Sequence, residues 1–238
     1  MKPIHLLAVL SSLLILASCH KANRKSGETP SSKAAASGTQ VEDLLADRSL
    51  GNWEHLLVDK SLGKADVWRV DENGVLICKG QPLGYLHTRK AYQDFKLSLE
   101  WRWAPGTEPT NSGVLLRIAA PPESFLPKCI EAQLQHGKAG DLYGFFGANI
   151  NAEGDRLKII ESAKIGTFKA VPRTGGTEKP AGEWNHYEIT VKGDTVELKI
   201  NGEVVNKAHG LDVIAGPIGL QSEGSEIHFR NIRLGPAH

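Results

Sequence analysis

The stretch from Cys129 to His136, read CIEAQLQH, carries a run of side chains that could do chemistry. Acid and amide groups occupy every second position and apolar residues lie between them: Glu131, Gln133 and Gln135 against Ile130, Ala132 and Leu134. Alternate residues of a β-strand point to opposite faces. The pattern therefore predicts a strand with a polar floor, on which a carboxyl group could transfer protons and amides could hold hydroxyl groups.

A second stretch, NSGVLLR from Asn111 to Arg117, places Gly113, Leu115 and Arg117 on one face of a predicted strand. A guanidinium group on that face could donate its fork of N–H groups to sugar oxygens. Aromatic side chains that could stack on a sugar ring are Trp101, Trp103, Tyr143, Phe145 and Phe146. The alternative interpretation is structural, because a polar strand face is often only solvated and aromatic residues at period two often belong to a core.

The elements that must position these residues are β-strands. Phe95 to Trp103 alternates apolar and polar residues, as do His186 to Lys192 and Val196 to Asn201, and Asn201-Gly202 is typical of a type I′ hairpin turn. Further predicted strands are 67–70, 74–78, 84–88, 112–118, 129–135, 217–221 and 227–234, the last with a bulge near Arg230-Asn231. One short helix is expected at 41–47. About ten strands without crossover helices predict an all-β fold, a jelly-roll sandwich of two antiparallel sheets.

Composition narrows the class of protein. The chain has 238 residues, 40% of them hydrophobic, and its 28 basic residues balance 27 acidic ones. This excludes a disordered chain and gives no support to nucleic-acid binding. The scattered histidines show no zinc-ligand spacing. A calcium or other divalent ion stays open, because oxygen-ligated sites leave little trace in a sequence. The oligomeric state also stays open.

The N-terminus predicts export and anchoring. Residues 1–18 are mostly apolar and too short to span a bilayer, as expected for a signal peptide. Leu16-Ala17-Ser18-Cys19 is similar to a bacterial lipobox, which implies lipidation of Cys19; a plain signal peptide is the alternative. Residues 19–40 then form a flexible tether, and 41–238 the β-sandwich domain. We expect a location in the cell envelope, on the outer membrane facing the periplasm. Export would permit a disulfide between Cys78 and Cys129, which the sequence leaves undecided.

In its order of motifs the chain resembles the 3-keto-disaccharide hydrolase domain family, whose fold is the concanavalin A-like lectin/glucanase sandwich. The matching segments span about residues 50–234 and are Trp53; Trp68-Arg69-Val70; Asn73-Gly74-Val75-Leu76; DFKLSLEWRW; NSGVLLR; IEAQLQHGKAGDLYGFFG; EKPAGEWNHYEITVKGD; Ile200-Asn201-Gly202; and IGLQSEGSEIHFRNIRL. Laminarinase-type glucanases share this fold and carry a Glu-x-Asp-x-x-Glu strand. Here the two later carboxylates are replaced by Gln133 and His136, which disfavours ordinary two-carboxylate hydrolysis.

The resemblance implies chemistry on a 3-keto sugar. A carbonyl at C3 acidifies the hydrogen on C2, so one base can remove it and the C1 oxygen can leave by elimination, after which water adds. We expect Glu131 as the base or acid and His136 as the second proton-transfer group. Arg117 and Gln133 would hold the oxyanion and hydroxyls. Motif matches add five rim candidates for substrate binding: Asn111, Tyr143, Gln221, Glu223 and Arg230.

Two further interpretations remain at this stage. The same polar floor would serve a non-catalytic sugar-binding lipoprotein, since binding needs only amides, Arg and rings. A structural or adhesion protein of the envelope would need no concave polar floor. The expected partners are an oligosaccharide or keto-sugar, the membrane through the lipid anchor, and an upstream sugar dehydrogenase. The discriminating observation is whether Glu131, Arg117 and His136 or another acid converge in one pocket.

Overall fold

The computed structural model of the chain describes residues 40–119, 125–176 and 178–237. The predicted signal peptide, Cys19 and almost all of the predicted tether lie outside these residues. Among the residues described, no helix is long and apolar enough to cross a membrane. The helical elements are short: the helix α1 (Lys64–Val67) and a 3-10 turn at Gly154–Arg156.

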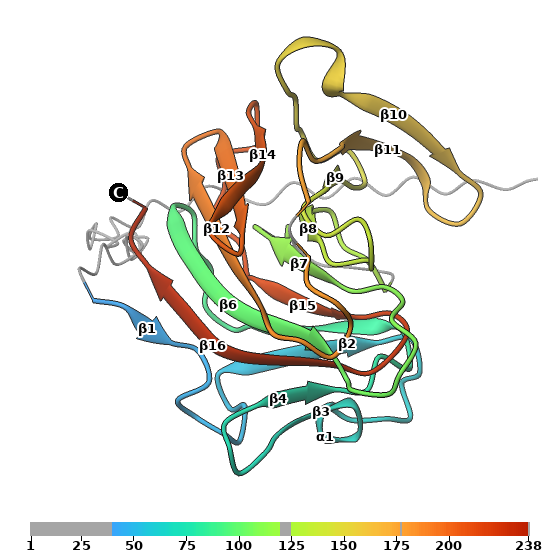
Figure 1. The fold of residues 1–238 in the computed structure, drawn as a ribbon, viewed down its shortest axis with the longest axis vertical. Coiled ribbons are helices and arrows are strands. Elements are labelled where there is room, and N and C mark those ends of the chain that lie inside the picture. The colour runs from blue at the N-terminus through green and yellow to red at the C-terminus, as the bar shows by residue number, and fades with distance from the viewer. Residues whose placement is uncertain (1–39, 120–124, 177, 238) are drawn as a thin grey trace, which may run out of the picture. The chain divides into compact units, whose positions relative to one another are not determined.

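Two antiparallel eight-stranded sheets form the body of the domain, as Figure 1 shows. The first sheet has the order β14 (Glu203–Ala208), β13 (Thr195–Ile200), β12 (Asn185–Lys192), β6 (Phe95–Trp103), β16 (Ile227–Gly235), β4 (Leu76–Cys78) and β3 (Trp68–Val70), with β1 (Glu42–Asp43) paired to β16. The second has the order β10 (Lys158–Ser162), β11 (Gly166–Val171), β9 (Leu142–Gly144), β8 (Ile130–Gln133), β7 (Gly113–Leu116), β15 (Gly219–Ser222), β5 (Gly84–Thr88) and β2 (Trp53–Leu57). The predicted all-β jelly-roll sandwich is confirmed.

The core lies between the sheets and follows the predicted alternation. In β6 every odd residue from Phe95 to Trp103 is buried, while the even residues are more exposed. Trp101 and Trp103 are 0% and 2% exposed, so they are core residues and not platforms for a sugar. Leu116 of β7 and Ala132 of β8 belong to this same core, which fixes their polar neighbours on the opposite face of the second sheet.

The predicted hairpin turn and the predicted bulge are both confirmed. Asn201 and Gly202 both have positive φ, 51° and 89°, as a type I′ turn requires. The register of β16 against β6 shifts between Arg230 and Arg233, where the bulge was predicted, and Asn231 has a φ of 53°.

The helix expected at 41–47 is wrong. Its residues instead form β1 and turns, because Glu42 and Asp43 pair with β16 and the Leu44 N–H donates to the Ile232 carbonyl at 2.9 Å.

The two cysteines of the described residues are free thiols. Cys78 lies on β4 in the first sheet, and Cys129 directly precedes β8 in the second. Both are buried, and burial raises the pKa of the Cys78 thiol to about 11. The pairing that the sequence left open is therefore absent from this structure, and both thiols are inert at neutral pH.

Candidate functional site

The outer face of the second sheet holds a cavity of about 240 Å³. Six of the nine catalytic and binding residues expected from the sequence line it: Asn111, Glu131, Gln133, Tyr143, Gln221 and Glu223. The other lining residues are Phe125, Leu126, Gln135, Lys138, Phe145, Ser162, Lys164, Ile165 and Phe168. A concave site with convergent polar groups and a partly apolar wall is the usual form of a small-molecule site.

Glu131 forms the centre of the cavity floor. It is 2% exposed, and its Oε1 has no hydrogen-bond partner among the described residues. Burial, together with the charge of Glu223, raises the pKa of the Glu131 carboxyl well above its usual value. Burial of this kind favours the protonated form of a carboxyl group, which can donate a proton to a bound substrate.

Gly113 makes room for that carboxyl. It pairs with Gln133 across the β7–β8 ladder, and the atoms nearest to a Cβ at this position would all belong to Glu131. A methyl group here would overlap Oε1 of Glu131. The absence of a side chain at Gly113 therefore lets the acid lie flat over β7 and keeps the floor hollow.

Gln133 is held in one orientation by the backbone that follows it. Its Oε1 accepts hydrogen bonds from the N–H groups of Leu134 and Gln135, at 2.8 and 2.7 Å. The side-chain NH₂ group is then the part of Gln133 that can donate to a ligand. Tyr143 lies directly opposite Glu131 in the β8–β9 register, and its hydroxyl donates to Asp141 at 3.3 Å.

Glu223 is a second acid in the same cavity. It pairs with Asn111 in an isolated bridge, and its Oε1 lies 3.7 Å from the Nζ of Lys164. Burial raises the pKa of the Glu223 carboxyl, and the charge of Lys164 and a hydrogen bond from Asn111 oppose that rise. Glu223 is less buried than Glu131 and has a cation beside it, so the two acids are in unlike environments suited to unlike roles.

Unpartnered acceptors complete the polar floor. Within the described part of the chain, Asn111 Oδ1 and Gln221 Oε1 are buried and have no hydrogen-bond partner, like Glu131 Oε1. Buried polar atoms are normally hydrogen-bonded, and leaving one unmade costs about 1–3 kcal/mol. Three such oxygens around one cavity are what the hydroxyl groups of a sugar could satisfy.

The remaining wall is aromatic and comes partly from a hairpin that the sequence did not predict. Tyr143, Phe145 and Phe168 contact one another with ring centroids 5.2–5.9 Å apart. Phe168 lies on β11, and Lys164 lies in the turn of the β10–β11 hairpin, which projects beyond the sandwich in Figure 1. Lys164 also lies over the ring of Phe125, with 4.5 Å from Nζ to the ring centroid.

Arg117 does not reach this cavity. Its φ is 49°, so the strand alternation ends at Leu116, and the guanidinium is buried at the opposite end of the sheet. There it donates to the carbonyls of Gln93, Asp212 and Gly193, each at 2.8 Å, and to the Asp94 carboxylate at 3.1 Å. Its role is to tie loops together, and the oxyanion role expected for it is not supported.

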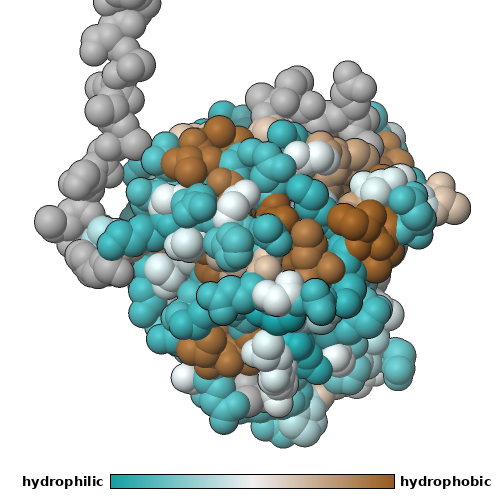
Figure 2. All heavy atoms as spheres, turned by 90° about the horizontal axis from the view of Figure 1, so that it is seen from above, coloured by the Kyte–Doolittle hydropathy of each residue, from teal (hydrophilic) through white to brown (hydrophobic). Residues whose placement is uncertain are grey.

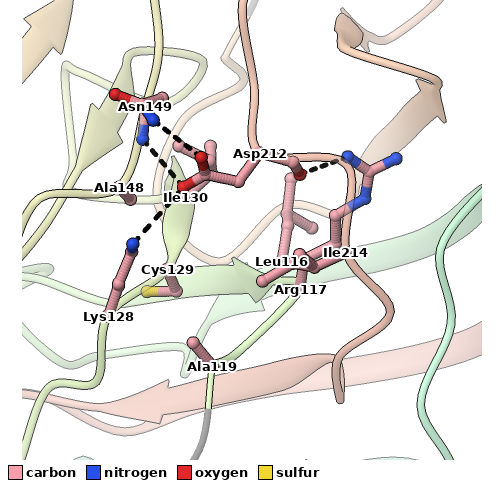
Figure 3. Close-up of a pocket in the computed structure, with 10 residues that line it drawn as sticks. All are labelled: Leu116, Arg117, Ala119, Lys128, Cys129, Ile130, Ala148, Asn149, Asp212 and Ile214. Atoms are coloured by element: carbon pink, nitrogen blue, oxygen red, sulfur yellow. Dashed lines mark hydrogen bonds and ion pairs between the residues drawn. The ribbon is translucent and has the colours of Figure 1, made fainter.

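Figure 3 shows the small hollow beside Arg117, where Asp212 receives hydrogen bonds from Asn149 and an ion pair from Lys128. Its volume is about 20 Å³, enough for about one water molecule and too small for a sugar.

His136 and Arg230 also lie elsewhere. The Nδ1 of His136 is 3.1 Å from Oε1 of Glu178, and the imidazole is largely exposed outside the cavity wall. Arg230 belongs to β16 in the first sheet, where it donates two hydrogen bonds to Glu100 and stacks on Trp184 at 4.1 Å. Neither side chain lines the cavity around Glu131, whereas Glu223 does, so Glu223 is the better placed candidate for the second proton transfer.

Across the described ranges, no group of three or more His, Cys, Asp or Glu side chains could hold a metal ion. On the face shown in Figure 2, hydrophobic side chains form separate patches between hydrophilic ones, without one continuous apolar surface. The cavity around Glu131 is therefore the site that the chemistry of the described residues favours.

Comparison with known proteins gives a family and a fold. The family model for the 3-keto-alpha-glucoside-1,2-lyase-like domain matches residues 40–235. A comparison with curated proteins finds no match.

Among solved structures, two Parabacteroides distasonis proteins named as candidate glycosyl hydrolases align with TM-scores of 0.58 and 0.57. They are 18% and 20% identical, and the alignments cover 83% of this chain and 94% and 99% of theirs. The carbohydrate-binding module CBM66 from Bacillus subtilis aligns at 0.53 with 13% identity, over 77% of this chain and 95% of that one. At these identities the structures support the shared sandwich fold.

Proposed function

The chain belongs to the family of 3-keto-alpha-glucoside-1,2-lyase-like domains, and we propose on that premise that the Glu131 cavity cleaves 3-keto-glycosides. The observation that carries the proposal is the pair of acids in one cavity. Glu131 is buried, its Oε1 has no hydrogen-bond partner among the described residues, and Glu223 lies beside Lys164. Ordinary glycosidases also use two acids, but with a 3-keto substrate one acid can remove the hydrogen on C2 while the other protonates the departing oxygen.

Glu223 acts first, as the base. The C3 carbonyl acidifies the hydrogen on C2, and the Glu223 carboxylate removes it. Its raised pKa brings it closer to neutral pH, where a general base works best, and Lys164 keeps the carboxylate form accessible. The electron pair of the C2–H bond moves toward the C3 oxygen, which gains negative charge. Lys164 and the NH₂ group of Gln133 are two donors of the cavity that can stabilise this oxyanion.

Glu131 acts second, as the acid. The C1–O bond breaks as a C1=C2 double bond forms, and the departing oxygen takes the proton of the Glu131 carboxyl. The ionised Glu131 can then remove a proton from water that adds at C1. The Glu223 side chain is partly exposed, so its proton exchanges with solvent before Glu223 delivers a proton to C2. Both acids end in their starting forms, and the net change is hydrolysis of the C1–O bond. Each proton transfer is worth about 10²–10⁴-fold in rate.

The test is turnover of a 3-keto-glucoside and of its unoxidised parent by the wild type and by Glu131→Gln. We expect release of the leaving group only from the keto form, and a loss of at least about 10²-fold in Glu131→Gln. Glu178→Gln is the matched control, because Glu178 bonds His136 outside the cavity. Unchanged turnover in Glu131→Gln would remove this residue from the mechanism.

A non-catalytic sugar-binding role is the second candidate. The buried, unpartnered oxygens of Asn111 and Gln221 favour sugar binding as much as they favour catalysis. Binding of the keto or parent glycoside without any release of the leaving group, measured by calorimetry beside the turnover assay, would establish this role in place of catalysis.

We also propose that the protein is anchored in the bacterial envelope through lipidated Cys19, facing the periplasm from the outer membrane. An oxidoreductase that converts the C3 hydroxyl of a glycoside to a ketone must then supply the substrate. Labelling with a fatty acid analogue, lost in Cys19→Ser, tests the anchor. Label retained in that variant would contradict it.

A further inference from the structure

The cavity has a polar end and an aromatic end, and Glu131 lies between them. Along β8, the Phe145 N–H donates to the Cys129 carbonyl at 3.1 Å, which places the aromatic rings beside the start of the strand. Beyond the other end of β8, the backbone bonds of Leu134 to Ser112 and His136 to Thr110 place Asn111 alongside Gln135.

Glu223 belongs to the polar end, because it pairs with Asn111. Lys164 reaches this end as well: its Nζ lies 3.7 Å from Oε1 of Glu223 and 4.5 Å from the ring centroid of Phe125. The proposed reaction then orients the substrate. The base must reach C2 of the sugar that carries the ketone, so this sugar lies at the polar end. The acid must reach the oxygen that joins this sugar to the leaving group, and Glu131 occupies that intermediate position. The leaving group therefore projects toward the aromatic end.

The aromatic end offers contact without hydrogen bonds. Phe145 is buried and supports Tyr143 and Phe168, whose rings are partly exposed to the cavity. Phe168 has no polar atom, and the Tyr143 hydroxyl is turned to Asp141. A second sugar placed here would leave several hydroxyl groups against rings, which costs free energy for each unmade hydrogen bond. An aromatic ring would instead pack edge-to-face or offset against Phe168 and Tyr143.

We propose that the substrates are 3-keto-glycosides whose leaving group carries an apolar, aromatic ring, in preference to 3-keto-disaccharides. This inference rests on the proposed function, because it uses the positions of the two acids to orient the substrate. It adds the chemical class of the leaving group, which depends on the aromatic end alone.

The experiment compares three 3-keto-glucosides whose leaving groups are all alcohols of similar acidity: methanol, benzyl alcohol and a second glucose. We expect kcat/KM for the benzyl substrate to exceed the values for the other two by about tenfold or more. Phe168→Ala should remove most of this advantage, because it should lower kcat/KM for the benzyl substrate by a larger factor than kcat/KM for the methyl substrate. Phe146→Ala is the matched control, because Phe146 is 45% exposed and outside the cavity wall. Phe168→Leu, which keeps an apolar side chain on β11, serves if the alanine variant does not fold.

The outcomes separate this inference from the proposed function. If the methyl or glucosyl substrate is cleaved at least as fast as the benzyl substrate, the preference for an aromatic leaving group is refuted. The proposed cleavage of 3-keto-glycosides is then still supported. An equal loss on all three substrates in the Phe168 variants also overturns it, because the ring would then support only the fold. If no keto substrate is cleaved, the proposed function fails and the inference fails with it.

Discussion

Replacing Gly113 by alanine is expected to damage both the stability and the activity of the protein through one contact. The added methyl group would overlap the Glu131 carboxyl, whose atoms are the three nearest to that position. Overpacking of this kind costs about 1–3 kcal/mol of unfolding free energy. For a chain of this size this corresponds to a fall in melting temperature of roughly 2–12 °C. If the carboxyl moves aside instead, a displacement of about 1 Å can cost about 10²-fold in rate.

A double-mutant cycle isolates that contact. In a Glu131→Ala background the carboxyl is gone, so Gly113→Ala should cost less than about 0.5 kcal/mol there. Gly175→Ala is the control for the glycine substitution itself, because a Cβ at Gly175 would meet no atom within 4 Å. Urea unfolding of the four variants measures the free energies, and turnover of a 3-keto-glucoside measures the activity. Equal costs of Gly113→Ala in both backgrounds would refute the argument that Glu131 occupies the space over Gly113.

Three other outcomes follow from the structure. Because burial raises the pKa of Glu131 in the folded state above its usual value of 4.5, the folded protein binds more protons than the unfolded one above that pH. Glu131→Gln should therefore gain stability relative to the wild type as the pH rises from about 5 to 8, and parallel stability curves would contradict this. Arg117→Met should lower the free energy of unfolding, measured in urea, by about 3–5 kcal/mol, because it removes four hydrogen bonds from a buried guanidinium to half-buried carbonyls and to Asp94. Arg230→Met on the surface should lower it by less than about 1 kcal/mol, and a larger loss in Arg230→Met than in Arg117→Met would contradict the structural role of Arg117. Cys78 and Cys129 should resist iodoacetamide in the native protein and react after unfolding without reductant, as peptide mass spectrometry can show; protection that persists in urea would indicate a disulfide.

The alternation of polar and apolar residues in the sequence was enough to predict which side chains form the floor of the cavity. The polar face of CIEAQLQH predicted that Glu131 and Gln133 would share one side of a strand, and the structure buries them side by side over the hollow at Gly113. The pattern works here because every second side chain of β7 and β8 packs in the main core. The side chains between them must therefore point to the opposite face of the sheet.

Alternation failed where a strand ended earlier than its pattern. Arg117 was expected beside Glu131, but its left-handed backbone turns the side chain toward the loop carbonyls. His136 was expected as the second proton-transfer group, although the alternation places it on the face opposite to Glu131. The strand β8 ends at Gln133, whose side chain accepts hydrogen bonds from the next two backbone N–H groups, and the His136 imidazole lies beside Glu178. Such ends depend on single dihedral angles and local hydrogen bonds, to which a period-two pattern is insensitive.

The residues that the sequence did not reveal come from the β10–β11 hairpin. Most of its side chains are exposed or only half-buried, so its sequence carries no alternation that marks a strand face. Lys164 and Phe168 reach the cavity because β11 pairs with β9 and the hairpin turn lies beside Glu223. The adjacency of Lys164 to Phe125 is likewise a product of tertiary packing between segments far apart in the chain.

The most direct test of the account is cleavage of a 3-keto-glucoside in deuterium oxide, followed by NMR at early times. Removal of the C2 hydrogen by Glu223 and return of a solvent-derived proton predict that the released keto-sugar carries deuterium at C2, that the unoxidised glucoside is not cleaved, and that Glu131→Gln releases almost no product. Release of a keto-sugar that retains its original hydrogen at C2 would contradict the elimination, and full activity in Glu131→Gln would contradict the role of the buried acid.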